Sequence, residues 1–230
     1  MSSDFFKILG YSVIGLLTII FIAGGYGMEW LIAVALVASG IYFLRLRVGK
    51  QQVNIAHIPE RFVVFDLETT GLDPEKHEII EFGAIRVNRD SINHETFQTL
   101  VKPSKKVPKK ITELTGINQD MLDLEGEPIE VALRKFLDFS GGLRLVAFNA
   151  DFDMAFLQNA AVKYSITIDN PVSCALKMSR RAWPERKSYS LASLAKDGNL
   201  SNDGTHRALG DCQRALIVYM AAASKLGTIR

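Results

Sequence analysis

The sequence predicts an α/β domain, with a mixed β-sheet flanked by helices, preceded by an N-terminal two-helix transmembrane hairpin. Apolar, β-rich segments follow one another closely at residues 62–66, 79–88 and 94–101, which favours antiparallel neighbours in one sheet. A fourth apolar segment at 144–148 lies between segments of helical spacing, which favours a parallel partner. At the N-terminus, residues 8–28 form an uncharged apolar run of membrane-spanning length.

A second apolar segment, residues 30–44, follows the first directly after Glu29. Together the two segments are too long for one membrane span and suit two short spans joined by a turn at residues 24–27. Each arm has about 17 residues, or roughly 25 Å of helix, and local thinning of the bilayer accommodates helices slightly shorter than a ~30 Å hydrocarbon layer. We therefore expect residues 1–48 to anchor the chain in a membrane.

The charges that flank the two arms predict their orientation. Lys7 precedes the first arm, Arg45, Arg47 and Lys50 follow the second, and the turn between them contains no Lys or Arg. Because positively charged flanks remain on the cytoplasmic side, both ends should face the cytoplasm. This pattern predicts a multi-pass protein of a bacterial-type inner (cytoplasmic) membrane, with the lipid bilayer as a partner and the folded domain in the cytoplasm.

A cleaved secretory signal is the alternative interpretation of this N-terminus. Lys7 followed by an apolar stretch is typical of such a signal. Against it, the stretch is longer than a usual signal core, no small-x-small cleavage site precedes polar sequence, and a second apolar arm follows at once. The sequence therefore favours the hairpin.

After the anchor, residues 49–60 form a polar linker, and residues 61–228 are expected to form a single domain with a buried core. The net charge of +2 arises within the first 50 residues, so the rest of the chain is close to neutral and has no global field that would hold long nucleic acid tightly. Local basic clusters exist, and their default interpretation is a solvated surface: Lys102, Lys105, Lys106, Lys109 and Lys110, and Arg180, Arg181, Arg186 and Lys187 around Trp183.

The first strand carries two acidic residues where it runs into polar sequence and Gly71. Side chains at i and i+2 of a strand point to the same face, so Asp66 and Glu68 present neighbouring carboxylates. Such a pair repels itself unless a cation lies between the two groups, and carboxylate oxygens suit Mg²⁺ or Mn²⁺ better than zinc. By itself the pair is also compatible with a solvated strand end.

The strand at 144–148 ends at Asn149 and is followed by a segment of helical spacing. Asp151 and Asp153 both fall in the first turn of the expected helix, where the helix dipole favours acidic side chains. The spacing alone leaves open whether either aspartate has another role.

Helices are expected near residues 108–138 and in most of the chain after the fourth strand. The last helix follows a polar, glycine-containing loop at residues 201–205. Positions five apart differ by about 140° around a helix, so we expect His206 on the loop and Asp211 on the helix. A loop-borne histidine suits a general base, because imidazole titrates near neutral pH.

These residues lie in segments that resemble the histidine-containing branch of the DEDD 3′-5′ exonucleases (DEDDh), and the chain is similar to the proofreading epsilon exonuclease of bacterial DNA polymerase III. The resemblance covers most of residues 60–225. It rests on five segments in the family's order, namely 65–71 as the first motif, 108–117, 149–153 as the second motif, 189–194, and 206–211 as the third motif.

The resemblance implies a ribonuclease H-like fold and a two-metal-ion phosphodiesterase. Asp66, Glu68 and Asp211 would bind two Mg²⁺ or Mn²⁺ ions directly. Asp153, which follows the phenylalanine of the second motif, would complete the site, and His206 would deprotonate the attacking water. Hydrolysis at DNA or RNA 3′ ends would then release nucleoside 5′-monophosphates.

The resemblance also implies which residues hold the terminal nucleotide: Thr69, Thr70, Gly71 and Leu72, with Asn149 from the second motif. Glycine at this place permits close approach of the backbone. One position departs from the family, which commonly has histidine before that asparagine, whereas this chain has Phe148. Because the family does not use that position as a metal ligand, we expect altered substrate fit and retained chemistry.

Two functions from different classes remain open, a membrane-anchored exonuclease and a catalytically idle module that binds nucleic-acid ends at the membrane. The presence of all five site residues favours the enzyme. Neither DNA nor RNA is favoured, because a sequence does not display how a pocket recognises the 2′-hydroxyl. Protein partners are not indicated. The few residues between the expected domain and Arg230 leave little room for a polymerase-tethering tail, which argues against a dedicated proofreading role.

The other residues with reactive side chains carry no comparable pattern. Cys174 and Cys212 have neither metal-type nor redox-type spacing and are expected to be reduced thiols. His57, His77 and His94 lack ligand spacing and are expected on the surface.

Overall fold

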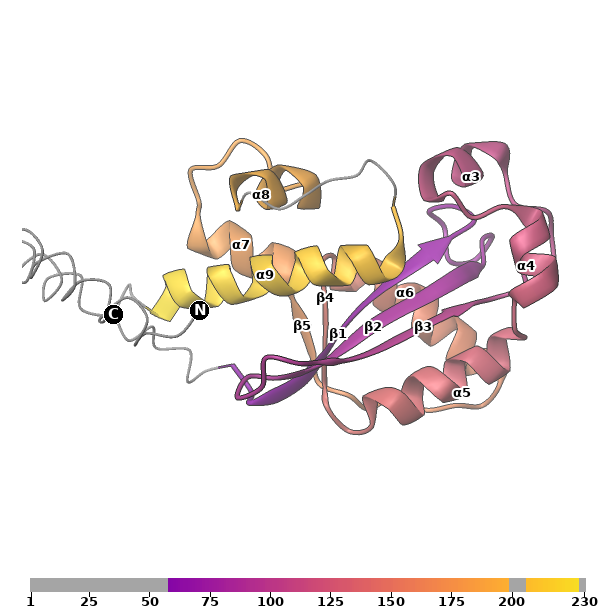
Figure 1. Cartoon of the computed structure of the whole chain (residues 1–230), viewed down its shortest axis with the longest axis horizontal. Coiled ribbons are helices and arrows are strands. Elements are labelled where there is room, and N and C mark those ends of the chain that lie inside the picture. Colours follow the sequence, from indigo (N-terminus) through magenta and orange to yellow (C-terminus); the bar gives the residue numbers. More distant parts are fainter. Residues whose placement is uncertain (1–57, 199–205, 228–230) are drawn as a thin grey trace, which may run out of the picture. The chain divides into compact units, whose positions relative to one another are not determined.

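The computed structural model describes residues 58–198 and 206–227, which all lie in one compact unit of the chain, Val53–Arg230. The strands are β1 (Arg61–Thr69), β2 (Ile79–Asn88), β3 (Glu95–Leu100), β4 (Arg144–Ala147) and β5 (Val172–Cys174) (Figure 1). The helices are α3 (Lys109–Thr115), α4 (Gln119–Glu125), α5 (Ile129–Ser140), α6 (Ala150–Lys163), α7 (Ala175–Ala182), α8 (Leu191–Asp197) and α9 (Ala208–Gly227).

The predicted membrane anchor, residues 1–48, and most of the predicted linker at 49–60 lie outside the described residues. Within residues 58–198 and 206–227, no helix combines the length and the apolar character needed to cross a bilayer.

In the described part of the chain, five strands form one mixed sheet in the order β3-β2-β1-β4-β5. β2 is antiparallel to both β1 and β3, whereas β4 is parallel to both β1 and β5. The mixed sheet predicted from the sequence is confirmed. β5 was not predicted, because a strand of three residues is too short for its alternation to be recognised.

The helical region predicted at 108–138 is divided into α3, α4 and α5. α3 ends at Gly116, whose positive φ of 73° is a conformation that glycine adopts readily. The side chain of Asn118 accepts a hydrogen bond from the backbone N–H of Met121 and caps α4. α5 begins directly after Pro128. The helices predicted near 108–138 are therefore three, and local cap and turn residues determine their bounds.

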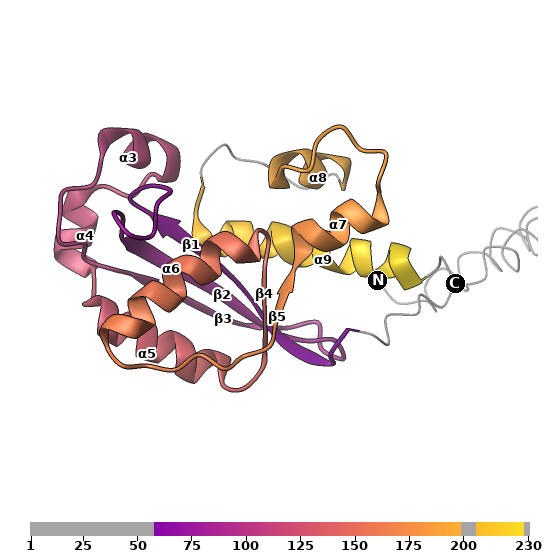
Figure 2. The same ribbon diagram turned by 180° about the vertical axis from the view of Figure 1, so that it is seen from behind.

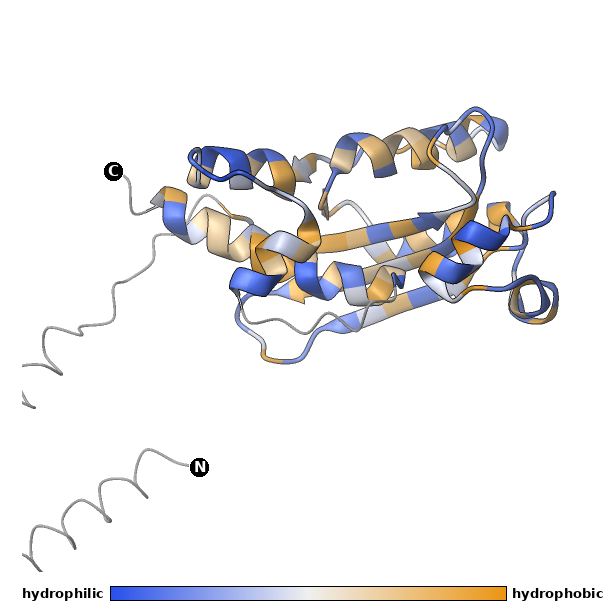
Figure 3. Cartoon of the chain, turned by 90° about the horizontal axis from the view of Figure 1, so that it is seen from above, coloured by the Kyte–Doolittle hydropathy of each residue, from blue (hydrophilic) through white to orange (hydrophobic). Residues whose placement is uncertain are grey.

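Successive side chains of β1 pack against different helices. Val63, Phe65 and Leu67 lie in a core cluster with residues of α5 and α6. Phe62 and Val64 lie in a second cluster with residues of α9. Figures 1 and 2 show these helices on opposite sides of the sheet. The helices carry both orange and blue residues in the hydropathy colouring, as expected for elements between a sheet and solvent (Figure 3).

The first turn of α9 lies directly on β2. A Cβ atom at Gly83 would lie 2.5 Å from the carbonyl carbon of Ala208, so only glycine permits this close approach. The thiol of Cys212 donates a hydrogen bond to the Gly83 carbonyl oxygen at 3.3 Å. Because side chains alternate along β1, Asp66 and Glu68 continue the face that α9 covers. The docking of α9 therefore brings its N-terminal turn to these carboxylates.

Candidate active site

Asp66 and Glu68 lie near the end of β1, which continues to Thr69, beyond the predicted end at residue 66. Glu68 is 9% exposed and Asp66 is partly exposed. In the pairing with β2, Asp66 is opposite Gly83 and Glu68 is opposite Glu81. The backbones of both residues are therefore paired with β2, and their carboxylates stand on one face of the sheet.

Asp153 lies in the first turn of α6 and is 3% exposed. Its carboxylate is held by a backbone hydrogen bond at Leu67 and is close enough to Asp66 to raise the pKa of that group. Asp151, in the same helical turn, is exposed and forms an ion pair with Lys177 at 2.7 Å. Of the two aspartates that the spacing could not distinguish, Asp153 therefore lies in the acidic cluster and Asp151 lies outside it.

His206 precedes α9, and Asp211 lies in the first turn of that helix, which confirms the predicted division between loop and helix. The backbone N–H of His206 donates to the Leu114 carbonyl oxygen of α3 at 3.1 Å. The imidazole is 52% exposed, and its Nδ1 atom lies 3.2 Å from Asp211 Oδ2. Ligand atoms of Glu68, His206 and Asp211 all lie within 4.8 Å of one another. Two segments that are distant in the sequence, the end of β1 and the start of α9, thus meet at one place.

The acidic side chains perturb one another strongly. Burial raises the pKa of Asp66 well above its usual range, and the charges of Asp153, Asp211, Glu68 and Glu81 raise it further. Burial, followed by the charges of Asp211, Glu81 and Asp153, raises the pKa of Glu68 to about 8. Burial also raises the pKa of Asp153 to about 7. Clustered carboxylates of this kind are characteristic of sites that bind cations.

Glu81 is a central member of the cluster that the sequence analysis missed. Its side chain is fully buried and accepts hydrogen bonds from Arg207, Gln98 and the backbone N–H of Ala208. A signal for it exists in the sequence, because an acidic residue within the apolar strand 79–85 needs a buried partner.

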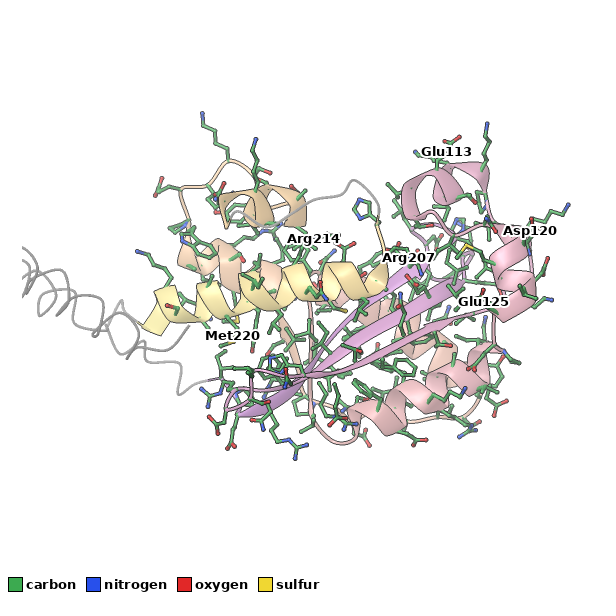
Figure 4. All side chains as sticks on the ribbon, in the orientation of Figure 1. Glu113, Asp120, Glu125, Arg207, Arg214 and Met220 are labelled. Carbon is green, nitrogen blue, oxygen red and sulfur yellow. The ribbon has the colours of Figure 1, made fainter. Side chains whose placement is uncertain are left out.

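Arg214 is a second residue that the sequence analysis missed. Its Nε and Nη2 atoms donate to Asp211 Oδ1 at 3.0 and 2.7 Å. Figure 4 shows Arg207 at the start of α9 and Arg214 farther along the same helix. Asp211 therefore has an arginine on one oxygen and His206 beside the other.

The predicted nucleotide-holding turn directly follows β1. Thr69 Oγ1 donates to the Gly71 carbonyl oxygen at 2.6 Å, and Thr70 Oγ1 accepts from the backbone N–H of Glu78 at 3.0 Å. These hydrogen bonds occupy the two threonine side chains within the turn. The apolar residue Leu72 is 82% exposed.

His77 supports this turn, although the sequence placed it on the surface. Its side chain is half-buried, and a Cβ atom at Gly71 would lie 2.4 Å from its ring. Its Nδ1 atom lies 3.2 Å from Thr70 Oγ1. The ring therefore packs on the glycine backbone behind the turn.

Asn149 and Phe148 join β4 to α6. Asn149 is exposed, and its side chain makes no capping hydrogen bond to α6, so its amide is available to a ligand. Phe148 is half-buried and packs against the core cluster of Phe62 and Val64. At this position the aromatic ring contributes to packing between the sheet and α9.

The predicted basic clusters are partly neutralised by ion pairs. Lys102 pairs with Asp123 at 3.1 Å, Lys109 with Glu113 at 3.6 Å, and Arg186 with Asp197. These contacts favour the solvated-surface interpretation for the residues concerned. Cys174 and Cys212 are free thiols, as predicted.

The donor set of the cluster fits hard divalent cations. Four carboxylates converge (Asp66, Glu68, Asp153 and Asp211), and one histidine lies beside them. The nearby Cys212 thiol is directed to the Gly83 carbonyl oxygen, so sulfur is not part of the set. Oxygen-rich groups of this kind suit Mg²⁺-like ions better than soft metals.

A family model described as Exonuclease (RNase T) matches residues 63–219. The DNA polymerase III subunit epsilon of Aquifex aeolicus is 38% identical over 167 residues, covering 72% of this chain and 81% of that protein. The PolC-type DNA polymerase III of Caldanaerobacter subterraneus is 38% identical over 174 residues, covering 76% of this chain and 12% of that protein. The chain thus spans only a small part of the PolC-type relatives.

Solved structures of exonuclease I have the same fold. One gives a TM-score of 0.64 at 20% identity, over 73% of this chain and 41% of that chain. Escherichia coli exonuclease I in complex with a dA16 oligonucleotide gives a TM-score of 0.62 at 20% identity, over 75% of this chain and 42% of that chain.

The family match and the epsilon relative show that the chain belongs to the DEDD-type exonuclease family, related to the epsilon and PolC exonuclease domains. This family is a class of metal-dependent 3′-5′ phosphodiesterases, and its members use divalent metal ions.

Proposed function

We propose that this domain hydrolyses phosphodiester bonds at nucleic-acid 3′ ends and releases nucleoside 5′-monophosphates. The observation that carries the proposal is the convergence of four carboxylates from β1, α6 and α9 beside the half-exposed imidazole of His206. A largely buried, self-repelling acidic cluster is costly to a fold, so its presence needs a functional reason.

Asp66, Glu68, Asp153 and Asp211 would hold two Mg²⁺ or Mn²⁺ ions. When bound, such ions supply positive charge that stabilises the entering and departing oxygens of a phosphodiester. The raised pKa values of Glu68 and Asp153 mean that cation binding releases protons from these groups.

His206 would accept the proton of the attacking water. Its Nδ1 atom lies beside Asp211 Oδ2, so the favoured tautomer carries its proton on Nδ1. The Nδ1–H group then donates a hydrogen bond to that carboxylate. The other ring nitrogen, Nε2, then has a free lone pair. Because half of the ring is exposed, Nε2 can reach a water molecule at the edge of the cluster.

The turn of residues 69–72 would position the terminal nucleotide against the carboxylates. Its threonine side chains are engaged within the turn, which leaves the Gly71 backbone and the exposed Leu72 side chain for contact with the nucleotide. The exposed amide of Asn149 adds a hydrogen-bonding group across the site. A single-stranded DNA 3′ end is the first substrate to test, because related exonuclease I structures contain single-stranded oligonucleotides.

The proposal is tested with the purified full chain and three 5′-labelled substrates of matched sequence: single-stranded DNA, duplex DNA and RNA. With Mg²⁺ or Mn²⁺, labelled strands should shorten stepwise from the 3′ end and nucleoside 5′-monophosphates should accumulate. Incubation with EDTA is the control, and all three substrates should then remain intact. Shortening of a substrate in EDTA would reveal a contaminating nuclease that needs no metal. Binding of 3′ ends without hydrolysis, on all three substrates and with both metals, would instead support the idle end-binding module.

We also propose that residues 1–48 anchor this enzyme in a bacterial-type cytoplasmic membrane with the nuclease domain in the cytoplasm. The proposal rests on the two apolar arms and their positively charged flanks. Protease should digest residues 50–230 in sealed inverted vesicles and leave them intact in right-side-out vesicles. The reverse pattern would contradict the orientation, and a mature chain that lacks the first arm would indicate a cleaved signal.

A further inference from the structure

Both carboxylate oxygens of Glu81 accept hydrogen bonds from donors of the protein. Glu81 is 0% exposed in the middle of β2. Its Oε1 atom accepts from Gln98 Nε2 at 2.9 Å and from Arg207 Nη2 at 2.5 Å. Its Oε2 atom accepts from Arg207 Nε at 3.2 Å and from the Ala208 backbone N–H at 2.9 Å.

This network holds the start of α9 on the sheet. The bond from Ala208 caps the first turn of the helix with a carboxylate, which is favourable at a helix N-terminus. Gly83, on the same face of β2, admits the helix backbone at a distance that excludes a side chain. Arg207 and Ala208 are thus fixed to β2 through a contact that spans 126 positions of the sequence.

His206 is the residue directly before Arg207, so the same contact limits where the imidazole can lie. On its other side, the His206 backbone N–H is bound to the Leu114 carbonyl oxygen of α3. The imidazole therefore projects from a backbone that is held at both ends, one by the helix α3 and the other by the strand β2.

Arg207 also determines what Glu81 can bind. Glu81 is directly opposite Glu68 in the β1–β2 ladder, so an unpaired Glu81 would offer a further carboxylate beside the proposed metal ligands. The planar guanidinium occupies both oxygens of Glu81 and satisfies it as an ion pair. Glu81 is thereby kept out of the metal-binding set.

We propose that Glu81 and Arg207 form a positioning pair that places the His206 imidazole against Glu68 and Asp211 for proton transfer. This inference rests on the proposed exonuclease function. Neither Glu81 nor Arg207 would contact the substrate. The rate of the chemical step would depend on the bidentate contact between them. A displacement of a catalytic group by about 1 Å is enough to lower a rate by roughly 100-fold.

The experiment compares four variants of the full chain: Glu81→Gln, Arg207→Gln, the Glu81→Gln/Arg207→Gln double variant, and Arg207→Lys. The double variant is the decisive one, because it removes both charges and leaves no buried ion without a partner. For each variant, thermal unfolding reports folding, calorimetric titration with Mn²⁺ reports the metal site, and hydrolysis of a single-stranded oligonucleotide gives kcat and KM separately.

For the double variant we expect a cooperative unfolding transition, Mn²⁺ binding and KM within about threefold of the wild type, and kcat lowered by roughly 100-fold. Arg207→Lys should give an intermediate kcat, since an ammonium keeps the charge and loses the planar fork. The matched control is Glu95→Gln, which removes an Arg86–Glu95 ion pair between β2 and β3 with an exposed carboxylate and should leave kcat unchanged.

Two results separate failure of this inference from failure of the proposed function. A wild-type chain without hydrolytic activity would contradict the proposed function itself. An active wild type together with a double variant whose kcat is within about threefold of it would overturn the positioning role and leave the pair as a stabilising contact only.

Discussion

Two groups of carboxylates meet at the end of β1 and differ in their partners. Glu81 and Asp211 are each held by an arginine, Arg207 and Arg214 respectively. Within the described part of the chain, Asp66, Glu68 and Asp153 have no such ion pair with an arginine, and burial together with the charges of neighbouring carboxylates raises the pKa of each. Two of these five acids thus have an arginine partner within the fold, and the other three do not.

This difference in partners explains how many acidic side chains can lie together in one site of a folded domain. Arg207 neutralises the most deeply buried carboxylate and joins α9 to the sheet. Asp66, Glu68 and Asp153 have no arginine partner, and bound divalent cations would complete their charge balance. Changes in the two groups should therefore have different effects.

The largest effect is expected for Asp66→Ala, which removes a carboxylate from the group without arginine partners. Both Mn²⁺ affinity and hydrolysis should fall, with kcat/KM lowered by more than about 10³-fold, because the loss acts through the bound cations. Calorimetric titration with Mn²⁺ and oligonucleotide hydrolysis measure the two quantities. Unchanged Mn²⁺ binding by this variant would remove Asp66 from the proposed ligand set.

A somewhat smaller loss is expected for His206→Ala. Hydrolysis should fall by about 10²- to 10³-fold, because a general base contributes rate acceleration of this order. Mn²⁺ binding and oligonucleotide binding should remain close to those of the wild type. Near-native turnover by His206→Ala would show that another group accepts the proton.

The stability of the metal-free protein should depend on pH through the group without arginine partners. The pKa of Glu68 is raised from 4.5 to about 8, so the folded state keeps a proton that the unfolded state releases. Stability should therefore fall as the pH rises from 4.5 through about 8, and Mn²⁺ should restore more of it at the higher pH.

Thermal unfolding in EDTA at about pH 5.5 and about pH 8.5 measures this dependence. Glu68→Gln provides the control, since an amide does not titrate and the difference between the two pH values should shrink. A wild-type unfolding midpoint that rises with pH, unaltered by this substitution, would be inconsistent with the raised pKa.

Arg214→Ala tests the other side of the comparison. It should raise Mn²⁺ affinity, because the guanidinium competes with a cation for Asp211 Oδ1. A hydrogen bond between charged groups with so little exposure contributes about 1.5 kcal/mol, which corresponds to roughly a tenfold change in Kd. Calorimetric titration decides the sign, and weaker Mn²⁺ binding would show that Arg214 orients Asp211 for the cation.

The smallest effect is expected for Asp151→Ala, on the same helical turn as Asp153. The side chains of Asp151 and its partner Lys177 are both exposed, so thermal unfolding should be close to that of the wild type. Oligonucleotide hydrolysis should be unchanged, whereas Asp153→Ala should abolish most of it. Equal losses in the two variants would contradict the separation of their roles.

Much of the fold and of the proposed site was accessible from the sequence. Apolar segments with the alternation of strands led to β1, β2, β3 and β4, and the helical spacing after Asn149 led to α6. Asp66, Glu68, His206 and Asp211 were candidates because they occur where strands end and helices begin, and the resemblance to the exonuclease family selected Asp153 over Asp151. The short strand β5 was missed, and the bounds of the helices within 108–138 were not predicted, since both depend on a few residues and their tertiary contacts.

The sequence by itself determined which acids stand at the ends of strands and in the first turns of helices, because local periodicity is encoded by neighbouring residues. Only the tertiary structure decided which acids are satisfied by arginine. Glu81 and Arg207 lie 126 positions apart, and their contact depends on the register of β2 and on the docking of α9 over Gly83. A hydrogen bond needs atoms within about 3 Å, and no property of either residue's sequence neighbours specifies that distance.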